Sequence, residues 1–230
     1  GTGGLSVTPT IRGTGRRRVL ILLNGARVLS DRRAGTSASF IPPDWIQQTE
    51  IIRGPGSVYF GSDAIGGVWS ISTIPERSHA FSSLFMAAGT ADQSVQGSVM
   101  AQDHSGDHWW HGALAFADAS DYRSPAGTIH HSGFQTAAMQ AAYGWEKGRI
   151  RTVVALLASE GKHIGKPDRE NDPLTRTGNP SRFNHYLIGN LRVSQFGGKG
   201  DLNVFVALNP FEYNLTKEDL RSGDLESSET

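Results

Sequence analysis

Residues 19–29, VLILLNGARVL, are the stretch of sequence that decides the fold. An apolar run from Val19 to Leu23 is followed by Asn24-Gly25 and then by a second, shorter apolar run. Asn and Gly tolerate the positive φ angles that a two-residue type I′ turn requires, so the pattern predicts a tight β-hairpin. Because the first arm is apolar at every position, we expect it to be buried on both faces.

Short helices and strands are predicted in the segment that follows the hairpin. Residues 42–48 favour a short helix, because a proline suits the first helical position and Asp44 suits the positive end of the helix dipole. Residues 49–53 and 68–72 are typical of strands, with one helical turn at residues 57–60 between them. This first part of the chain is therefore expected to be a mixed α+β unit.

The sequence changes its pattern at Pro75. Beyond it, runs of roughly ten residues alternate in polarity, as in β-strands that face lipid on one side. The pattern predicts seven strands, near residues 79–89, 93–103, 108–118, 134–146, 149–160, 185–196 and 201–211. We therefore divide the chain into an α+β unit over residues 1–75 and a region of membrane-spanning strands over residues 76–230.

The connections between these strands alternate in length. Short connections lie at residues 105–107, 147–148 and 197–200, and long ones at 119–133 and 161–184. Short turns on one side and long loops on the other are typical of outer-membrane barrels. The short-turn end also carries an expected interfacial girdle of Trp109, Trp110, Tyr143 and Trp145. The alternative is a soluble β-sandwich whose aromatic side chains belong to its core.

Composition excludes several function classes. Lys+Arg and Asp+Glu both total 22, so no net charge favours binding to nucleic acid. The chain has no cysteine, which excludes disulfides and thiol chemistry. We find no nucleophile elbow, phosphate-binding loop or dinucleotide fingerprint, and we predict no catalytic site and no enzymatic activity. A chain that starts at Gly1 and stops in the polar run 222–230 is expected to be cut at both ends.

Five motifs follow one another in a specific order and spacing. They are PTIRG at residues 9–13, VLILLNGARV at 19–28, IPPDWI at 41–46, EIIRGPGSVYFGS at 50–62 and AIGGVWSIS at 64–72. Together they resemble the plug domain of TonB-dependent outer-membrane receptors. The resemblance implies the C-terminal part of an α+β plug, followed by the first antiparallel strands of a 22-stranded barrel in the bacterial outer membrane, in contact with lipid.

The same resemblance implies a function. Receptors of this family take up a scarce nutrient, most often a ferric siderophore, and the TonB–ExbB–ExbD complex drives the uptake through a segment before Gly1. Haem and cobalamin are the alternative ligands. No cofactor is implied, since iron enters only as part of a transported chelate. Rivals from other classes are an outer-membrane adhesin or pore and a soluble β-rich binding domain or sugar-cleaving enzyme.

Two arginines stand in the repeated Ile-Arg-Gly motif. Arg12 and Arg53 resemble plug arginines that pair with barrel glutamates in this family, and here the glutamates are expected beyond Thr230. A charge inside a plugged lumen needs a partner, which favours this pairing over two solvated surface arginines.

Two basic clusters lie at the open end of the predicted hairpin, opposite its turn. The hairpin register places Arg18 opposite Asp31, Arg17 opposite Arg32, and Arg16 opposite Arg33. Like charges directly opposite each other are destabilising, unless the chains splay into water or an anion binds between them. The resemblance implies that this end faces the extracellular side. We identify Arg16, Arg17, Arg32 and Arg33 as a candidate site for an anionic ferric siderophore, with a solvated basic loop as the alternative.

The histidines do not predict a metal site. His104, His108 and His111 are irregularly spaced, and His130-His131 fall in a long connection. Neither group has the spacing of a closed zinc site. A haem ligand is the functional alternative, and ordinary surface histidines are the structural one.

Overall fold

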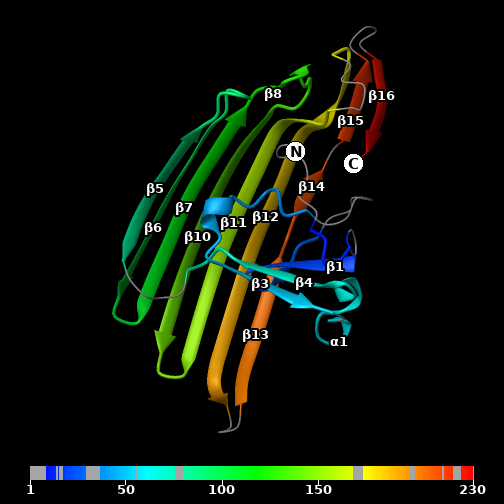
Figure 1. Ribbon diagram of the computed structural model, residues 1–230. Helices are drawn as coiled ribbons and strands as arrows, with labels where there is room; N and C mark the ends of the chain where they lie inside the picture. The colour runs from blue at the N-terminus through cyan, green and yellow to red at the C-terminus, as the bar shows by residue number, and fades with distance from the viewer. Residues whose placement is uncertain are drawn as a thin grey trace.

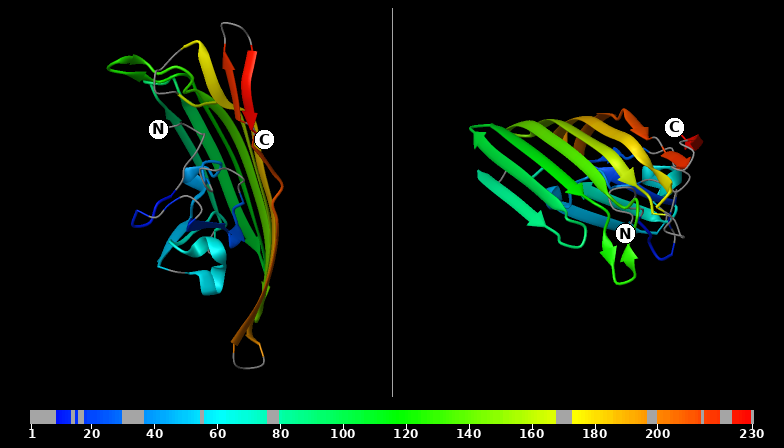
Figure 2. Two further views of the ribbon diagram at one scale, coloured as in Figure 1. Left: turned by 90° about the vertical axis from the view of Figure 1, so that its right-hand side faces the viewer. Right: turned by 90° about the horizontal axis from the view of Figure 1, so that it is seen from above.

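The computed structural model describes residues 9–13, 15, 18–29, 37–54, 56–75, 80–167, 173–196, 200–213, 215–219 and 224–229. It has two parts: an N-terminal unit, formed by the described residues up to Pro75, and a curved sheet that begins at Phe81 (Figure 1). The N-terminal unit lies on the concave face of the curved sheet, as the side view shows (Figure 2). We call this face of the sheet inward and the opposite face outward.

A four-stranded sheet forms the centre of the N-terminal unit. Its strands are β1 (Val19–Leu23), β2 (Ala26–Arg27), β3 (Gln48–Arg53) and β4 (Gly67–Ser72), in the spatial order β2-β1-β4-β3. β1 and β4 are parallel, and the other neighbours are antiparallel. All residues of β1 except Leu22 are buried, which confirms the predicted burial of its two faces.

The predicted hairpin is confirmed at its turn. Asn24 and Gly25 have φ angles of 50° and 86°, the left-handed conformation of a type I′ turn, and Leu23 pairs with Ala26. The second arm is shorter than expected, since β2 ends at Arg27. Val19 pairs instead with Gly67 on β4. The register proposed for the residues beyond the arms falls outside the described part of the chain.

Short helical segments connect the strands as predicted. They are η3 (Pro43–Trp45), with a proline and Asp44 in its first turn, α1 (Ser57–Phe60), and η4 (Ser62–Ala64), for which no helix was predicted. Arg27 holds the last two against the hairpin. Its guanidinium donates to Asp63 Oδ2 at 2.6 Å and to the Phe60 carbonyl oxygen at 2.7 Å.

The curved sheet is antiparallel and open. Its strands are β5 (Phe81–Ala88), β6 (Val95–Ser105), β7 (His108–Ala119), β10 (Phe134–Lys147), β11 (Ile150–Gly165), β12 (Thr175–Phe196), β13 (Gly200–Leu208), β14 (Phe211–Tyr213), β15 (Leu215–Asp219) and β16 (Asp224–Glu229). A small hairpin, β8 (Arg123–Ser124) and β9 (Gly127–Thr128), stands in one long connection. The predicted strands are all present. β14 and β15 continue the last of them along β12, and the polar run near the C-terminus contains a further strand, β16.

The long connection predicted at residues 161–184 is wrong, because β11 and β12 extend far into it. The strands pair up to Gly165 and Gly178, which leaves residues 166–174 as the connection. Polar residues above the apolar band can remain in strands because water replaces lipid there. Pro180 fits within β12 because neither neighbouring strand pairs with it, while the register with β11 is the same on both sides of it.

Alternating side chains give the curved sheet two different faces. Leu84, Met86, Leu114 and Val206 point outward and are 58–76% exposed. Adjacent residues in a strand point to opposite faces, so the two neighbouring tryptophans cannot both belong to an outer girdle. Of the predicted girdle, Trp110 and Tyr143 are exposed, with Tyr143 directly opposite Trp110.

Trp109 is not part of the girdle, and that prediction is wrong. Its ring points inward, is 1% exposed and covers Gly144, where an added Cβ would lie 2.0 Å from the indole. Among the residues that the structure describes, no helix is long and apolar enough to cross a membrane.

The 230-residue chain is expected to require detergent or lipid to remain monomeric. Its outward face is apolar, and β5 has an unpaired edge that can pair with another chain. Size-exclusion chromatography with and without detergent would measure this. A monodisperse monomer that melts sharply and cooperatively in detergent-free buffer would contradict the expectation.

Candidate functional site at the inner face of the curved sheet

One apolar cluster joins the N-terminal unit to the inward face of the curved sheet. Ile21 and Trp45 from the first part share this cluster with Trp109 and Tyr186 from the second. The rings of Phe40 and Tyr186 are stacked, with centroids 5.6 Å apart and planes 7° apart. The contact therefore excludes water in the manner of a protein core.

A buried chain of hydrogen bonds crosses the same contact. Asn24, in the hairpin turn, accepts the Thr73 N–H at 2.8 Å and donates to Thr73 Oγ1 at 2.9 Å. Thr73 Oγ1 donates to Gln140 Oε1 at 2.6 Å, and Gln140 Nε2 donates to the Thr73 carbonyl oxygen at 3.0 Å. Thr73 is 0% and Gln140 3% exposed, so these groups have exchanged water for each other. We call this chain the Asn24–Thr73–Gln140 latch.

Two further polar contacts hold the segment of residues 38–46. The hydroxyl of Ser98, on β6, donates to the carboxylate of Asp44. Arg182, on β12, donates to Ser39 Oγ at 2.8 Å. Ser98 and Arg182 are both buried. The segment is thus fastened to strands on two sides of the inward face.

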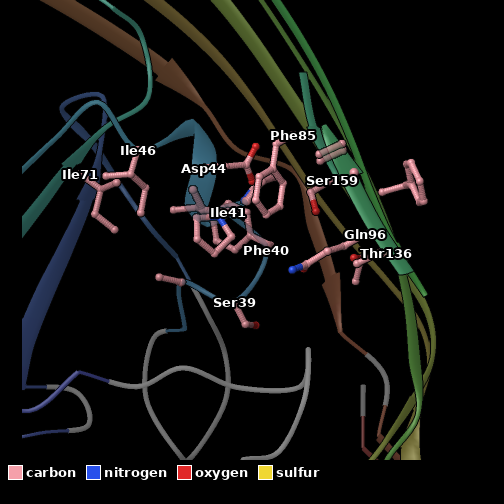
Figure 3. Close-up of a pocket in the computed structure, with 18 of the residues that line it drawn as sticks. Ser39, Phe40, Ile41, Asp44, Ile46, Ile71, Phe85, Gln96, Thr136 and Ser159 are labelled. Atoms are coloured by element: carbon pink, nitrogen blue, oxygen red, sulfur yellow. The ribbon is translucent and has the colours of Figure 1, made fainter. Parts of the chain in front are cut away.

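A cavity of about 340 Å³ separates this segment from the inward face between these contacts (Figure 3). Phe40 and Ile41 line it from the N-terminal unit, and Phe85, Thr136 and Ser159 line it from the curved sheet. A volume in this range is typical of small-molecule sites. The cavity and its rim are the candidate functional site.

The long connection at residues 120–133 is fastened at its base by Asp121. The carboxylate accepts the backbone N–H groups of His131, Ser132 and Gly133 at 3.0, 2.7 and 3.1 Å. Burial opposes ionisation of Asp121, but these donors and nearby His131 outweigh it and hold the pKa of the carboxyl below its ordinary value. The His131 ring also lies 3.0 Å from the Pro173 carbonyl oxygen, which links this connection to the next.

The basic cluster predicted from the sequence, Arg16, Arg17, Arg32 and Arg33, lies outside the described residues. Neighbouring Arg18 is exposed, and its carbonyl oxygen accepts the Gly66 N–H at 2.7 Å. The ligand role of the four arginines stays a prediction.

Arg12 and Arg53 lie at the same end of the N-terminal sheet. Arg53 pairs with Gly67, and the side chain of Ile11 lies against the same glycine. Both arginines are exposed, and no ion pair among the described residues includes either. Their pairing with glutamates of a barrel stays a prediction.

The histidines do not converge. On β7, His111 points inward and is 2% exposed, whereas His108 points outward and stacks on Tyr143 with centroids 5.8 Å apart. His104 is exposed on the neighbouring strand. Among the described residues, no group of three or more His, Cys, Asp or Glu side chains could hold a metal ion.

Sequence reasoning did not single out the residues of the latch. Asn24 was predicted only as a turn residue, and Thr73 and Gln140 had no role. Gln140 has the same residue type as Gln135 on the same strand, which is exposed on the outward face. Odd-numbered and even-numbered residues of β10 point to opposite faces, so Gln135 points outward and Gln140 inward. The sequence shows this only once the apolar face of β10 is assigned.

Comparisons with known proteins agree with this architecture. Residues 1–68 match the family described as TonB-dependent Receptor Plug Domain. The chain is 28% identical over 218 residues to the vitamin B12 transporter BtuB of Vibrio vulnificus (strain CMCP6), which covers 86% of this chain and 35% of the relative. It is 31% identical over 112 residues to a hemin receptor of Yersinia enterocolitica, which covers 49% of this chain and 15% of the relative.

Solved structures show the same fold. The copper transporter OprC superimposes with a TM-score of 0.77 at 20% identity, over 93% of this chain and 33% of that one. The siderophore receptor PiuA from Acinetobacter baumannii gives 0.65 at 15% identity, over 94% of this chain and 32% of that one.

Residues 1–68 match the plug-domain family, and the comparisons together support a fragment of a TonB-dependent outer-membrane receptor. It spans between 15% and 35% of the length of these relatives. The predicted fold class, an α+β plug followed by antiparallel strands of a transmembrane β-barrel, is thereby confirmed, as is the bacterial outer membrane as its location. The relatives are transporters and receptors, in agreement with the prediction of a protein that is not an enzyme. The number of 22 strands stays an implication of the resemblance.

Replacing Gln140 with Leu in the whole receptor should loosen the N-terminal unit. The substitution removes the acceptor of the buried Thr73 hydroxyl proton and the donor to the buried Thr73 carbonyl oxygen, which costs about 1–3 kcal/mol. We expect faster hydrogen exchange of the backbone amides in β1 and β4, measured by mass spectrometry.

The matched control is Gln135→Leu, on the outward face of the same strand. Equal exchange in the Gln135 and Gln140 variants would show that the latch does not hold the N-terminal unit.

Proposed function

We propose that this chain is part of a receptor that imports a scarce nutrient across the bacterial outer membrane, driven by TonB. One observation carries the proposal: the N-terminal unit is held on the inward face by buried polar contacts, while the outward face is apolar. Closed into a barrel in lipid, a wall of this kind with a folded unit held inside would form a pore that is shut until work is done on those contacts. Contact with the TonB–ExbB–ExbD complex, through a segment outside the described residues, belongs to the same proposal.

The proposed ligand is an anionic ferric siderophore. Support comes from the four arginines near the ends of the predicted hairpin arms and from the likeness to the siderophore receptor PiuA. Guanidinium groups bind polyanions through charge-assisted hydrogen bonds. Cobalamin is the second candidate, because the sequence relatives include the vitamin B12 transporter BtuB.

An uptake experiment tests the transport function and separates the ligands. Cells that lack their own receptors would express the whole receptor and be offered a radiolabelled catecholate iron chelate, haem, cobalamin or copper. We expect saturable uptake of the iron chelate that stops when the inner-membrane energy source is removed. Energy-independent entry of all four compounds would indicate a pore, and the absence of energy-dependent uptake of any of them would contradict the proposal.

The Arg17→Gln/Arg32→Gln double variant should weaken binding of the iron chelate. We expect a loss of about tenfold, which corresponds to about 1.4 kcal/mol. The loss should be smaller at high salt, because exposed charges are screened. Titration of the whole receptor with the chelate at two ionic strengths measures both effects.

Arg12→Gln and Arg53→Gln serve as charge-matched controls. Combined in one double variant, they remove the same two charges from positions outside the basic cluster and are expected to disturb the seating of the plug without changing ligand affinity. Wild-type affinity of the Arg17/Arg32 variant for every iron chelate tested would rule out the basic cluster as a ligand site.

A further inference from the structure

The cavity beside residues 38–46 exists because the strands facing it carry small side chains. Ala115, Ala117 and Ala138 line it from neighbouring strands, and all three are on the inward face. Aromatic rings stand around this floor: Phe40 on the N-terminal unit and Phe85 on β5. Figure 3 shows the Phe85 ring close to the segment that carries Phe40 and Ile41. The floor and walls therefore leave a mostly apolar space.

Three hydrogen-bonding side chains line this space without a protein partner. They are Gln96 on β6, Thr136 on β10 and Ser159 on β11. None takes part in a side-chain hydrogen bond to another described residue, although Ser159 is only 3% exposed. Buried hydroxyls are usually hydrogen-bonded, so an unpartnered hydroxyl at the cavity wall indicates a missing acceptor or donor.

The charges around the cavity favour a neutral occupant. Asp44 is the one charged side chain among the described residues that line it, and its carboxylate accepts the Ser98 hydroxyl. The buried Arg182 guanidinium donates to Ser39 at the edge of the cavity and offsets this negative charge. An anionic iron–oxygen centre placed here would face a carboxylate, whereas a neutral group would meet only hydroxyl, amide and apolar surfaces.

Size limits the occupant. A cavity of about 150 Å³ accommodates one benzene ring, and this one is about 340 Å³. It therefore has room for two fused rings with polar substituents.

We propose that this cavity is a binding subsite for a neutral, planar ring system of one or two rings that carries hydrogen-bonding groups. Gln96, Thr136 and Ser159 hold its polar edge, and the alanine floor and Phe40 hold its faces. The inference rests on the proposed function, since it assigns one part of the imported ligand to a subsite separate from the basic cluster. The rings would belong to the organic framework of the nutrient, not to its charged centre.

Binding of benzimidazole to the whole receptor in detergent tests the subsite. Benzimidazole has two fused rings, one donor and one acceptor. Ligand-observed NMR should show saturable binding, with weaker binding of naphthalene, which has no polar groups, and of 2-naphthoate, which is an anion. Equal binding of all three compounds would overturn the assignment.

Ala138→Phe fills the cavity and should weaken benzimidazole binding at least about tenfold. Its matched control is Ala137→Phe, which adds the same ring to the adjacent, outward position of β10 and should leave binding unchanged. Ser159→Ala, which does not change the packing, should weaken binding by about fivefold through the loss of one hydrogen bond.

Equal binding to wild type and the Ala138→Phe receptor would overturn the subsite. Fragment binding is measured without transport, so its failure is distinguishable from failure of the proposed function. A receptor that imports a nutrient but does not bind benzimidazole loses only the subsite. One that binds benzimidazole but imports none of the four tested compounds loses only the transport proposal.

Discussion

Each strand of the curved sheet must meet two different surroundings, because successive side chains point to opposite faces. The outward positions carry Leu84, Leu114 and Val206, which suit hydrocarbon. The inward positions carry Gln140, Ser159 and Arg182, which suit a folded polypeptide with polar groups of its own. A slip of one residue in any strand would exchange the two sets, so the apolar outward face fixes the register of the whole sheet.

The inward face binds the N-terminal unit through two kinds of contact. Apolar packing around Trp45 and Tyr186 stabilises the contact but does not fix the orientation of the unit. The latch and the Arg182–Ser39 bond fix the orientation of the unit. In any other orientation their buried donors and acceptors would lack partners, which costs free energy. A unit seated this way has one well-defined position, yet it can leave that position when water is admitted to replace the few polar partners.

Local rules predicted much of this structure. The Asn24-Gly25 turn follows from the φ preferences of two residues, and the strands follow from an alternation that persists over their whole length. Trp109 was wrongly assigned to the girdle because the prediction did not consider that adjacent residues of a strand point to opposite faces. The ends of β11 and β12 were misplaced because polar residues were taken for a loop where the ladder continues in water.

The contacts of the candidate site could not be predicted in this way. Which inward residue meets Thr73, and which alanines leave a cavity beside Phe40, depends on how the N-terminal unit sits against the strands. That position results from the summed packing of two parts that are far apart in the sequence. The basic cluster was readable from the sequence because it is a run of charges, but the latch consists of common residue types in common positions.

Chain connectivity distinguishes the latch from the other polar contacts. Thr73 precedes Phe81, the first residue of the curved sheet, by 81 − 73 = 8 positions, whereas Asp44 precedes it by 81 − 44 = 37. Closing the longer loop costs about 1 kcal/mol more in chain entropy. If the N-terminal unit comes loose from the sheet, the short connection therefore keeps Thr73 closer than Asp44 to the first strand of the sheet.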